Sequence, residues 1–370
     1  MKIHIFIARM GVGGAERVCV NLANEFAKKG NEVHIVVLNL ENDVNTHLLN
    51  ENVQVHSLNV SRLRYSFFAM LKYIKKYRPP FLFVFGNEMA VILNKMKKLH
   101  LISTPVIVRV LNNVNISLAK EDNVSPIVEN YLKNAQKQLA DMSHVIAQCD
   151  AMKEMIVEKK LVGEDKITRV YNPVSSDLIE KTMAIKVPFA ERAADRVKEL
   201  VFIGRLDPQK NLSHLIEAFR MVHEKNEKTC LRLIGTGLLE ENIKKLAEEK
   251  GLSDCVHFEG VCKNMEQIYA TADVVVLSSE YEGMPNCLIE AIGCGVPIVS
   301  YDCPIGPREI VVDDVNGFLV TYNDMNQLAE KINACLERQW NEEEIRKTVE
   351  KFSVSYIAET YMELFKKVNH

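Results

Sequence analysis

Two glutamates eight positions apart, Glu282 and Glu290, are the residues of this sequence best spaced to act on one ligand. They lie in the run SSEYEGMPNCLIEAIGCGVPIVS, between an apolar, β-branched segment and the segment VPIVS. This pattern predicts strand, loop, helix and strand, with Pro285 in the first helical turn and Gly293 or Gly295 closing the helix. Ligands of open α/β sheets bind at the carboxyl ends of strands, and both carboxylates fall near such an end.

Two cations upstream, Arg205 and Lys210, follow the apolar segment LVFI and precede an amphipathic helix predicted over 212–223. Arginine supplies a planar fork and lysine a point charge, so two such residues beside a helix N-terminus suit a doubly charged phosphate group. The alternative is a pair of ordinary surface cations on a loop.

The elements that must position these residues alternate along the whole chain. At 370 residues the chain exceeds one ordinary core, so we expect two α/β domains with parallel sheets. Asn172-Pro173 favours a turn and places the boundary after residue 174, with an irregular linker up to about 196. Strands are predicted at 2–8, 32–38, 53–58, 81–85, 106–110, 144–147, 200–203, 231–234, 256–258, 273–277 and 296–300, and closing helices at 324–352 and 355–367.

Composition is that of a globular protein, with 47% hydrophobic and 26% charged residues. No apolar run approaches the ~20 residues that span a bilayer, and the N-terminus does not have the form of a signal peptide. Nine cysteines without a C-x-x-C pair favour reduced thiols, a cytoplasmic location and no metal site.

Charge is divided unevenly: residues 1–180 hold 23 Lys and Arg against 18 Asp and Glu, about +5, and the remainder is about −8. Residues 61–78 combine basic and aromatic side chains in a predicted helix, which could lie on an anionic membrane surface. The alternative is an ordinary covering helix with a solvated basic face. We expect peripheral association with the inner face of a membrane, and no nucleic-acid partner.

A glycine-rich turn, Gly11 to Gly14, joins the first strand to a helix and suits an anion. A dinucleotide fingerprint is disfavoured because Glu16 occupies the place of its third glycine. A purely structural tight turn is the other interpretation. Arg109, Asn112 and Asn113 come just past a strand end, where they would face a ligand.

Taken together, the motifs GRL…KN, GTG, EGMPN…EA and GVPIV in the second half, with GGAER in the first, resemble the retaining GT-B glycosyltransferases of family 4. The segment CPIGPREI resembles a variant of surface-polysaccharide and lipid-linked oligosaccharide transferases. The resemblance implies two Rossmann-like domains whose parallel sheets face a central cleft. It also implies an acceptor domain over 1–174, a donor domain over 175–354 and a last helix, 355–370, that crosses back to the first domain.

The resemblance also implies roles for individual residues. Arg205 and Lys210 would hold the donor diphosphate without a metal or other cofactor, Glu282 would face the donor sugar, and Glu290 would bind the ribose hydroxyls. Other donor-binding positions would be Gly13, Gly14, Gly204, Gly235, Val261, Lys263, Gly283, Met284, Pro285 and Asn286. Many relatives carry a histidine after the strand equivalent to 106–110, which this sequence lacks. The acceptor side would then fall to Glu16, Arg109, Asn112 and Asn113.

The expected function is transfer of a hexose or N-acetylhexosamine from a nucleotide sugar, UDP-linked by preference, to a lipid-linked or surface-glycan acceptor. Whether Glu282 is a nucleophile or a stabiliser of positive charge stays open. The alternatives are a nucleotide-sugar epimerase of the same architecture and a non-catalytic nucleotide- or glycan-binding module. A phosphorylase-like enzyme is disfavoured by the length of the chain.

Overall fold

The computed structural model describes residues 1–370 except 12, 42, 112–137 and 370. The chain forms two compact units, one of residues 1–173 with 354–370 and the other of residues 174–353. These bounds lie within one residue of the expected ones. Unit 1 and unit 2 are described separately below.

Unit 1 is built on a parallel sheet of seven strands in the order β3-β2-β1-β4-β5-β6-β7. The strands are β1 Lys2–Phe6, β2 Glu32–Val37, β3 Val53–Ser57, β4 Leu82–Phe85, β5 Val106–Arg109, β6 His144–Ala147 and β7 Ile167–Arg169. Most of their side chains are buried, as expected for a sheet covered on both faces. The described helices are α1 Gly14–Lys28, α2 Phe67–Tyr77, α3 Asn87–Lys98, α6 Asp150–Glu158 and α14 Val354–Asn369, with 3-10 turns at Thr46–Leu48, Leu63–Tyr65, Gln138–Asp141 and Glu164–Lys166.

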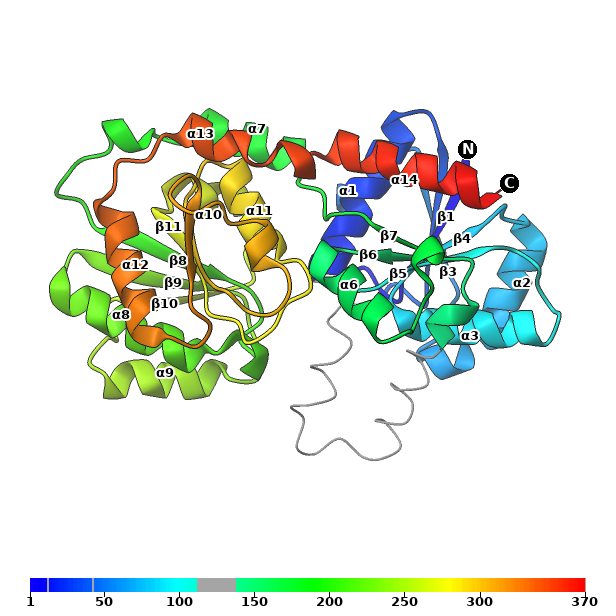
Figure 1. Ribbon diagram of the computed structural model, residues 1–370, viewed down its shortest axis with the longest axis horizontal. Helices are drawn as coiled ribbons and strands as arrows, with labels where there is room; N and C mark the ends of the chain where they lie inside the picture. The colour runs from blue at the N-terminus through cyan, green and yellow to red at the C-terminus, as the bar shows by residue number, and fades with distance from the viewer. Residues whose placement is uncertain (12, 42, 112–137, 370) are drawn as a thin grey trace. The chain divides into compact units, whose positions relative to one another are not determined.

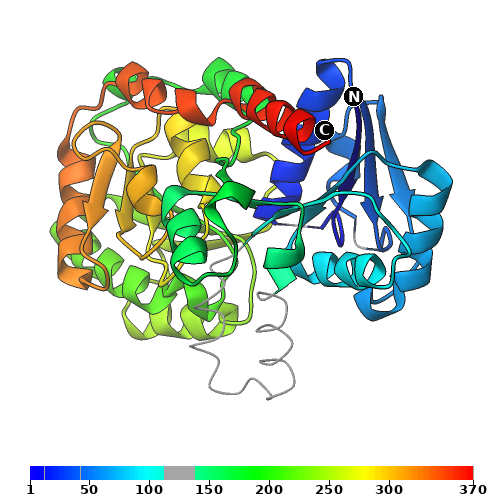
Figure 2. The same cartoon turned by 45° about the vertical axis from the view of Figure 1, so that its right-hand side comes forward.

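The two faces of this sheet are covered by different helices (Figures 1 and 2). On one face, Tyr73 of α2 packs edge-on against His4 and Phe6 of β1. On the other, α14 packs against α1 and brings Phe365 into contact with Phe83 of β4. The last helix therefore completes the core of unit 1, although it follows unit 2 in the sequence.

Unit 2 is built on a parallel sheet of six strands in the order β10-β9-β8-β11-β12-β13. The strands are β8 Lys198–Ile203, β9 Thr229–Ile234, β10 Val256–Gly260, β11 Val274–Leu277, β12 Ile298–Tyr301 and β13 Gly317–Val320. Helices α8 (Leu212–Lys225) and α12 (Met325–Glu337) pack on one another and on the sheet, and α11 (Asn286–Gly293) packs on β11 and β12. The helices are α7 Ser176–Ile185, α8 Leu212–Lys225, α9 Glu240–Glu249, α10 Met265–Thr271, α11 Asn286–Gly293, α12 Met325–Glu337 and α13 Glu342–Lys347, with 3-10 turns at Phe189–Glu191, Pro208–Lys210, Pro307–Glu309 and Glu350–Phe352.

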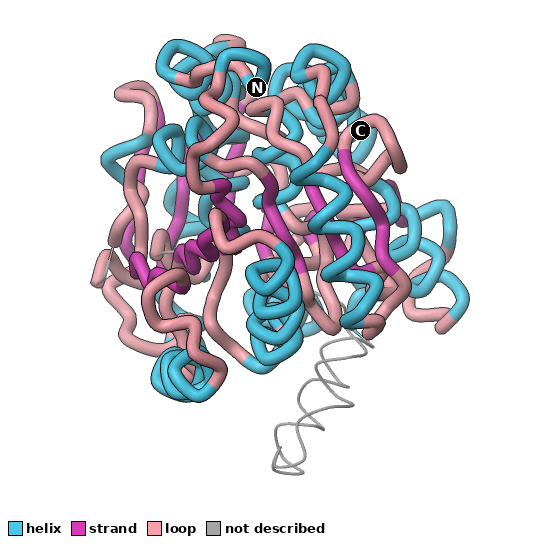
Figure 3. Tube along the Cα trace, turned by 90° about the vertical axis from the view of Figure 1, so that its left-hand side faces the viewer, coloured by secondary structure: helices cyan, strands magenta, loops and turns pink. Residues whose placement is uncertain are grey.

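The strand order of unit 2 reverses between β8 and β11, because β9 and β10 follow on one side and β12 and β13 on the other. Such a reversal separates the loops at the carboxyl ends of the two central strands and makes room for a ligand. Figure 3 shows the strands enclosed between helices. In unit 2 the loops after β8 and β11 carry the predicted cations and Glu282.

Several predicted elements differ from the observed ones. The helix expected over 61–78 begins only at Phe67, because a 3-10 turn and Ser66 precede it. The expected irregular linker contains α7, whose first turn is capped by the Ser175 hydroxyl accepting from Leu178 N at 3.3 Å. Pro285 lies at the N-cap of α11 rather than inside it, and Gly295, with φ of +67°, ends that helix.

Candidate active site

The loops that follow β8 and β11 are joined by backbone and side-chain hydrogen bonds. The Ser278 hydroxyl donates to the carbonyl of Lys210 at 2.8 Å, and Glu280 N donates to the carbonyl of Gln209 at 2.8 Å. The Gln209 amide also donates to the carbonyl of Tyr281 at 2.7 Å. These bonds fix the two loops together at the point where the strand order reverses.

Lys210 and Glu282 meet across this junction as an ion pair, with Lys210 Nζ 2.5 Å from Glu282 Oε1. The Ser279 hydroxyl donates to the same oxygen at 2.6 Å. Both charged side chains are nearly buried, with 12% and 8% of their surface exposed. Burial alone would lower the pKa of Lys210, but the facing Glu282 carboxylate outweighs it and the pKa is raised. Lys210 is therefore a fixed positive charge near neutral pH.

Arg205 lies at the start of the same loop and has 67% of its side-chain surface exposed. Its guanidinium pairs with Asp207 at 2.9 Å. It forms no hydrogen bond or ion pair with Lys210 or Glu282 among the bonds of the described residues. An exposed ion pair of this kind contributes little to stability and is easily exchanged for another anion. Arg205 can thus turn to a phosphate group at small cost.

Glu290 projects from α11 and is 7% exposed. Its Oε2 accepts a hydrogen bond of 2.8 Å from the hydroxyl of Tyr269, a fully buried side chain on α10. Burial, and then the Glu290 carboxylate, raise the pKa of Tyr269 well above its usual value, so the phenol stays a donor. The carboxylate is held in one orientation by this bond.

Glycines allow the loops around these residues to approach closely. Gly235 has φ of +133°, and a Cβ built on it would lie 2.0 Å from the carbonyl oxygen of Gly204. Gly306 has φ of +101°, and its Cβ would lie 2.8 Å from the carbonyl oxygen of Gly283. A side chain at either position would displace the loop that bears Lys210 or the loop that bears Glu282.

The remaining donor-side positions surround these loops in unit 2. Gly283, Met284 and Pro285 are buried, and Asn286 begins α11 half-buried, so their backbone lies at the N-terminal end of that helix. Val261 and Lys263 are exposed on the loop after β10, and Gly260, the last residue of that strand, accepts a hydrogen bond of 2.7 Å from Gly235 N.

In unit 1, the predicted glycine turn leads directly into α1. Gly13 is extended and α1 starts at Gly14, which is exposed. A Cβ on Gly13 would lie 2.3 Å from an Oε2 of Glu16, so the carboxylate of Glu16 lies over this glycine. The turn therefore presents a helix N-terminus together with one acidic side chain.

Arg109 requires a correction, because its side chain is buried inside unit 1 with 1% exposed. Its Nε donates to the hydroxyl of Tyr361 at 2.9 Å, and a second nitrogen donates to the side-chain oxygen of Asn172. Arg109 is thus buried among partners of its own unit, whereas the sequence predicted a side chain that faces a ligand. Asn112 and Asn113 lie outside the described residues.

Sequence reasoning missed two residues that hold the predicted carboxylates, Ser279 and Tyr269. Ser279 lies three positions before Glu282, so its hydroxyl could have been proposed as a local partner. Tyr269 comes from another helix, and nothing in the spacing pairs it with Glu290. That pairing depends on how α10 packs beside α11.

Comparison with known proteins adds the decisive observation. The family model for "Glycosyl transferases group 1" matches residues 185–352, and that for "Glycosyltransferase Family 4" matches residues 12–178. The two matches together span most of both units. This chain belongs to the group 1 glycosyltransferases. The expected family and the glycosyltransferase activity are thereby confirmed, whereas the retaining mechanism and the roles of the individual site residues stay predictions.

Curated relatives of similar length include two Campylobacter jejuni enzymes. One, "N-acetylgalactosamine-N,N'-diacetylbacillosaminyl-diphospho-undecaprenol 4-alpha-N-acetylgalactosaminyltransferase", is 28% identical over 91% of this chain and 90% of its own. The other, "GalNAc-alpha-(1->4)-GalNAc-alpha-(1->3)-diNAcBac-PP-undecaprenol alpha-1,4-N-acetyl-D-galactosaminyltransferase", is 26% identical over 100% and 99%. The crystal structure of Anabaena HepE with UDP-glucose superposes with a TM-score of 0.79 at 19% identity, over 99% of this chain and 100% of that one. That likeness confirms the GT-B fold.

Within the described part of the chain, no helix is long and apolar enough to cross a membrane. Among the same residues, no group of three or more His, Cys, Asp or Glu is arranged to hold a metal ion. The expectation of a metal-independent reaction stays a prediction.

Proposed function

We propose that this glycosyltransferase moves an N-acetylhexosamine or hexose from a UDP-sugar to a lipid-linked glycan acceptor, with retention of the anomeric configuration. The main support for the proposed nucleotide-sugar donor is the buried Lys210–Glu282 ion pair at the strand-order reversal of unit 2. A cation fixed beside a carboxylate suits a substrate that loses a diphosphate while its sugar gains positive charge.

In this mechanism Lys210 and Arg205 bind the diphosphate and stabilise the charge that develops on the leaving nucleoside diphosphate, without a metal ion. Lys210 is fixed before the ligand arrives, whereas Arg205 exchanges Asp207 for phosphate. Glu282 uses Oε1 for Lys210 and Ser279 and presents its other oxygen to the donor sugar. Glu290, oriented by Tyr269, accepts from the ribose hydroxyls.

The substrate assignment is supported by the relatives. Both Campylobacter enzymes are named as N-acetylgalactosaminyltransferases acting on undecaprenol-linked diphosphates, and the HepE structure holds UDP-glucose. A chain that is similar to all three over nearly its whole length is best explained by a nucleotide-sugar donor and a lipid-linked acceptor. Glu16 and the glycine turn of unit 1 would bind on the acceptor side.

A lipid-linked acceptor implies contact with a membrane surface. The segment around α2 carries Phe68, 78% exposed, and Tyr65, 58% exposed, beside the exposed cations Lys72 and Lys75. The sequence contains no Asp or Glu between Glu51 and Glu88. Aromatic side chains among unopposed cations suit an anionic, interfacial surface, so unit 1 associates with the inner face of the membrane.

The test is turnover of UDP-GalNAc, UDP-GlcNAc and UDP-glucose with an undecaprenol-diphosphate-linked glycan, with the product's anomeric configuration read by NMR. Lys210→Met should lower kcat by about 10²–10³, the loss seen when one fixed donor to a developing charge is removed. Activity should persist in EDTA. The control Lys228→Met changes an exposed lysine of the same unit and should leave turnover unchanged. Wild-type turnover that Lys210→Met and Glu290→Ala do not alter would refute the site assignment.

A further inference from the structure

The segment that follows α7 places two cations, Lys186 and Arg192, inside unit 2. Their side chains are 1% and 7% exposed. Neither contacts Lys210, Glu282 or Glu290 in any bond seen here. Burying a charge is costly unless it is paired and hydrogen-bonded, so the groups that receive these cations indicate what they do.

The side chain of Lys186 reaches the C-terminus of α11, the helix that carries Glu290. Its Nζ donates to the carbonyl of Cys294 at 2.9 Å and to that of Gly295 at 2.8 Å, and it pairs with Glu342 at 2.9 Å. The last carbonyls of a helix have no partner within the helix and form the negative end of its dipole. Lys186 therefore fixes the end of α11 one turn beyond Glu290.

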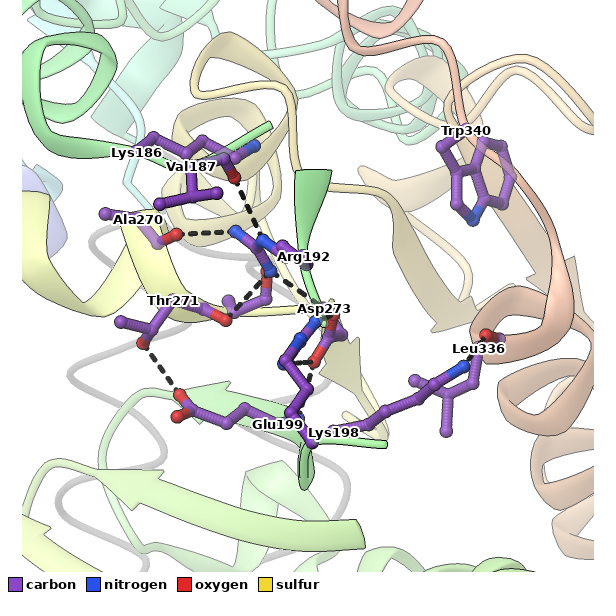
Figure 4. Close-up of polar contacts among 12 residues, drawn as sticks. Lys186, Val187, Arg192, Lys198, Glu199, Ala270, Thr271, Asp273, Leu336 and Trp340 are labelled. Atoms are coloured by element: carbon purple, nitrogen blue, oxygen red, sulfur yellow. Dashed lines mark hydrogen bonds and ion pairs between the residues drawn. The ribbon is translucent and has the colours of Figure 1, made fainter. Parts of the chain in front are cut away.

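Arg192 does the same for α10, the helix that carries Tyr269. Its guanidinium donates to the carbonyls of Ala270 at 2.6 Å and of Thr271 and Ala272 at 3.1 Å, and it pairs with Asp273 at 3.2 Å (Figure 4). These carbonyls directly follow Tyr269, whose hydroxyl holds Glu290. Arg192 therefore fixes the second helix on which the orientation of Glu290 depends.

The two cations share one aromatic ring, that of Phe189. Lys186 Nζ lies 4.7 Å and Arg192 Cζ 4.5 Å from its centroid. Both distances are within the range of cation–π attraction. Residues 186–192 thus form a single clamp on the ends of α10 and α11.

We propose that Lys186 and Arg192 are positioning residues for Glu290, holding α11 and α10 so that its carboxylate meets the ribose hydroxyls of the donor. The inference rests on the proposed function, because it takes Glu290 as the ribose-binding group. It goes further by assigning a part in donor binding to Lys186 and Arg192, whose bonds are to helix ends rather than to Lys210, Glu282 or Glu290.

The same unit offers a matched control in Lys198, which is part-buried and donates to the carbonyl of Leu336 at the end of α12 (Figure 4). Helix α12 carries none of the donor-site residues. Loss of Lys198 removes a helix-end cation of the same kind without touching α10 or α11. Trp340, the only tryptophan, lies in unit 2 and reports whether each variant is folded.

Calorimetric titration with UDP and with 2′,3′-dideoxy-UDP separates positioning from general stability. The wild type should bind UDP about tenfold to a hundredfold more tightly than the dideoxy analogue, the effect of one to two charge-assisted hydrogen bonds. Lys186→Met should lower this ratio by about threefold to tenfold while leaving the affinity for the analogue unchanged. Lys198→Met should keep the wild-type ratio. In Glu290→Gln, the further change Lys186→Met should have no effect on the ratio.

The outcomes separate the two proposals. If Glu290→Gln abolishes the preference for UDP but Lys186→Met keeps it, the inference is wrong and the ribose assignment stands. If the folded wild type shows no preference, or binds neither UDP nor the corresponding GDP pair, both fail. Should Lys186→Met not fold, Glu342→Gln decides, because it removes the anionic partner of Lys186 and should lower the ratio about threefold. An unchanged ratio there also overturns the inference.

Discussion

At the scale of single residues, the proposed donor site depends on the absence of side chains at glycines as much as on the positions of its charges. Gly235 follows β9, and the carbonyl of Gly204 at the end of β8 occupies the space that a Cβ would need. Lys210 Cε in turn lies 3.3 Å from the Cβ position of Gly204. The position of the cation is therefore coupled to the loop of a neighbouring strand.

Gly235→Ala should weaken UDP binding by about tenfold or more, because the new methyl group displaces the loop that carries Lys210. It should also lower the free energy of unfolding by more than the ~1 kcal/mol expected for alanine at positive φ. The control is Gly251→Ala, at φ of +71° with no atom within 4 Å of its Cβ position. Calorimetry and urea unfolding followed by Trp340 fluorescence measure both quantities. Equal losses in the two variants would show that backbone conformation alone matters.

At the scale of elements, Arg109 at the end of β5 joins the two stretches of chain that make up unit 1. Asn172 lies one residue before the chain leaves the unit, and Tyr361 lies on α14, after it returns. The guanidinium also lies 5.3 Å from the ring centroid of Phe85. A buried arginine with these partners fastens α14 to the sheet.

Arg109→Met should lower the free energy of unfolding by about 2–4 kcal/mol, because it removes a buried charged donor that binds the Tyr361 hydroxyl and the side-chain oxygen of Asn172. Amide hydrogen exchange should rise along residues 354–369. The matched change Arg169→Met removes a guanidinium that is 35% exposed and pairs with Asp150, so it should cost less than about 1 kcal/mol. Urea unfolding followed by circular dichroism compares them, and similar losses would argue against a fastening role.

The elements themselves were largely predictable, because alternating apolar strands and amphipathic helices follow from period and composition. The strands on either side of Glu282 and Glu290 and the strand before Lys210 appear as expected. Two elements of unit 2 show the failures: α7 was taken for an irregular linker, and β13 was not predicted. Lys186 and Arg192 were missed with them, since only tertiary packing shows that they bind backbone carbonyls 78 to 109 positions away.

The chemistry of individual positions was less predictable than their location. Lys210 and Glu282 are 72 positions apart, and their pairing follows from β8 and β11 being neighbours in the sheet. Arg109 likewise lies at the carboxyl end of a strand, yet it turns inward because Tyr361 and Asn172 offer it buried partners. Being near the carboxyl end of a strand fixes a residue's place at the edge of a sheet, but not the direction of its side chain.

At the scale of the whole molecule, charge is divided between the two halves of the chain, about +5 over residues 1–180 and about −8 over the rest. The acidic half nevertheless binds an anionic donor in our proposal, which it can do because Lys210 is fixed locally at short range. The positive half does not bind the donor diphosphate in our proposal, and its exposed cations are concentrated around α2. In our proposal, long-range charge therefore serves the membrane and local charge serves the donor.

Binding to anionic vesicles tests this division of charge. Lys72→Glu with Lys75→Glu should lower partitioning onto phosphatidylglycerol-containing vesicles by at least tenfold, since each lysine near such a surface contributes about 1 kcal/mol. Added salt should weaken wild-type binding in the same direction. The control pair Lys159→Glu with Lys166→Glu changes two exposed lysines of unit 1 by the same charge but lies outside α2. If both pairs reduce sedimentation with vesicles equally, net charge rather than the α2 surface governs association. If neither does, unit 1 does not bind the membrane through charge.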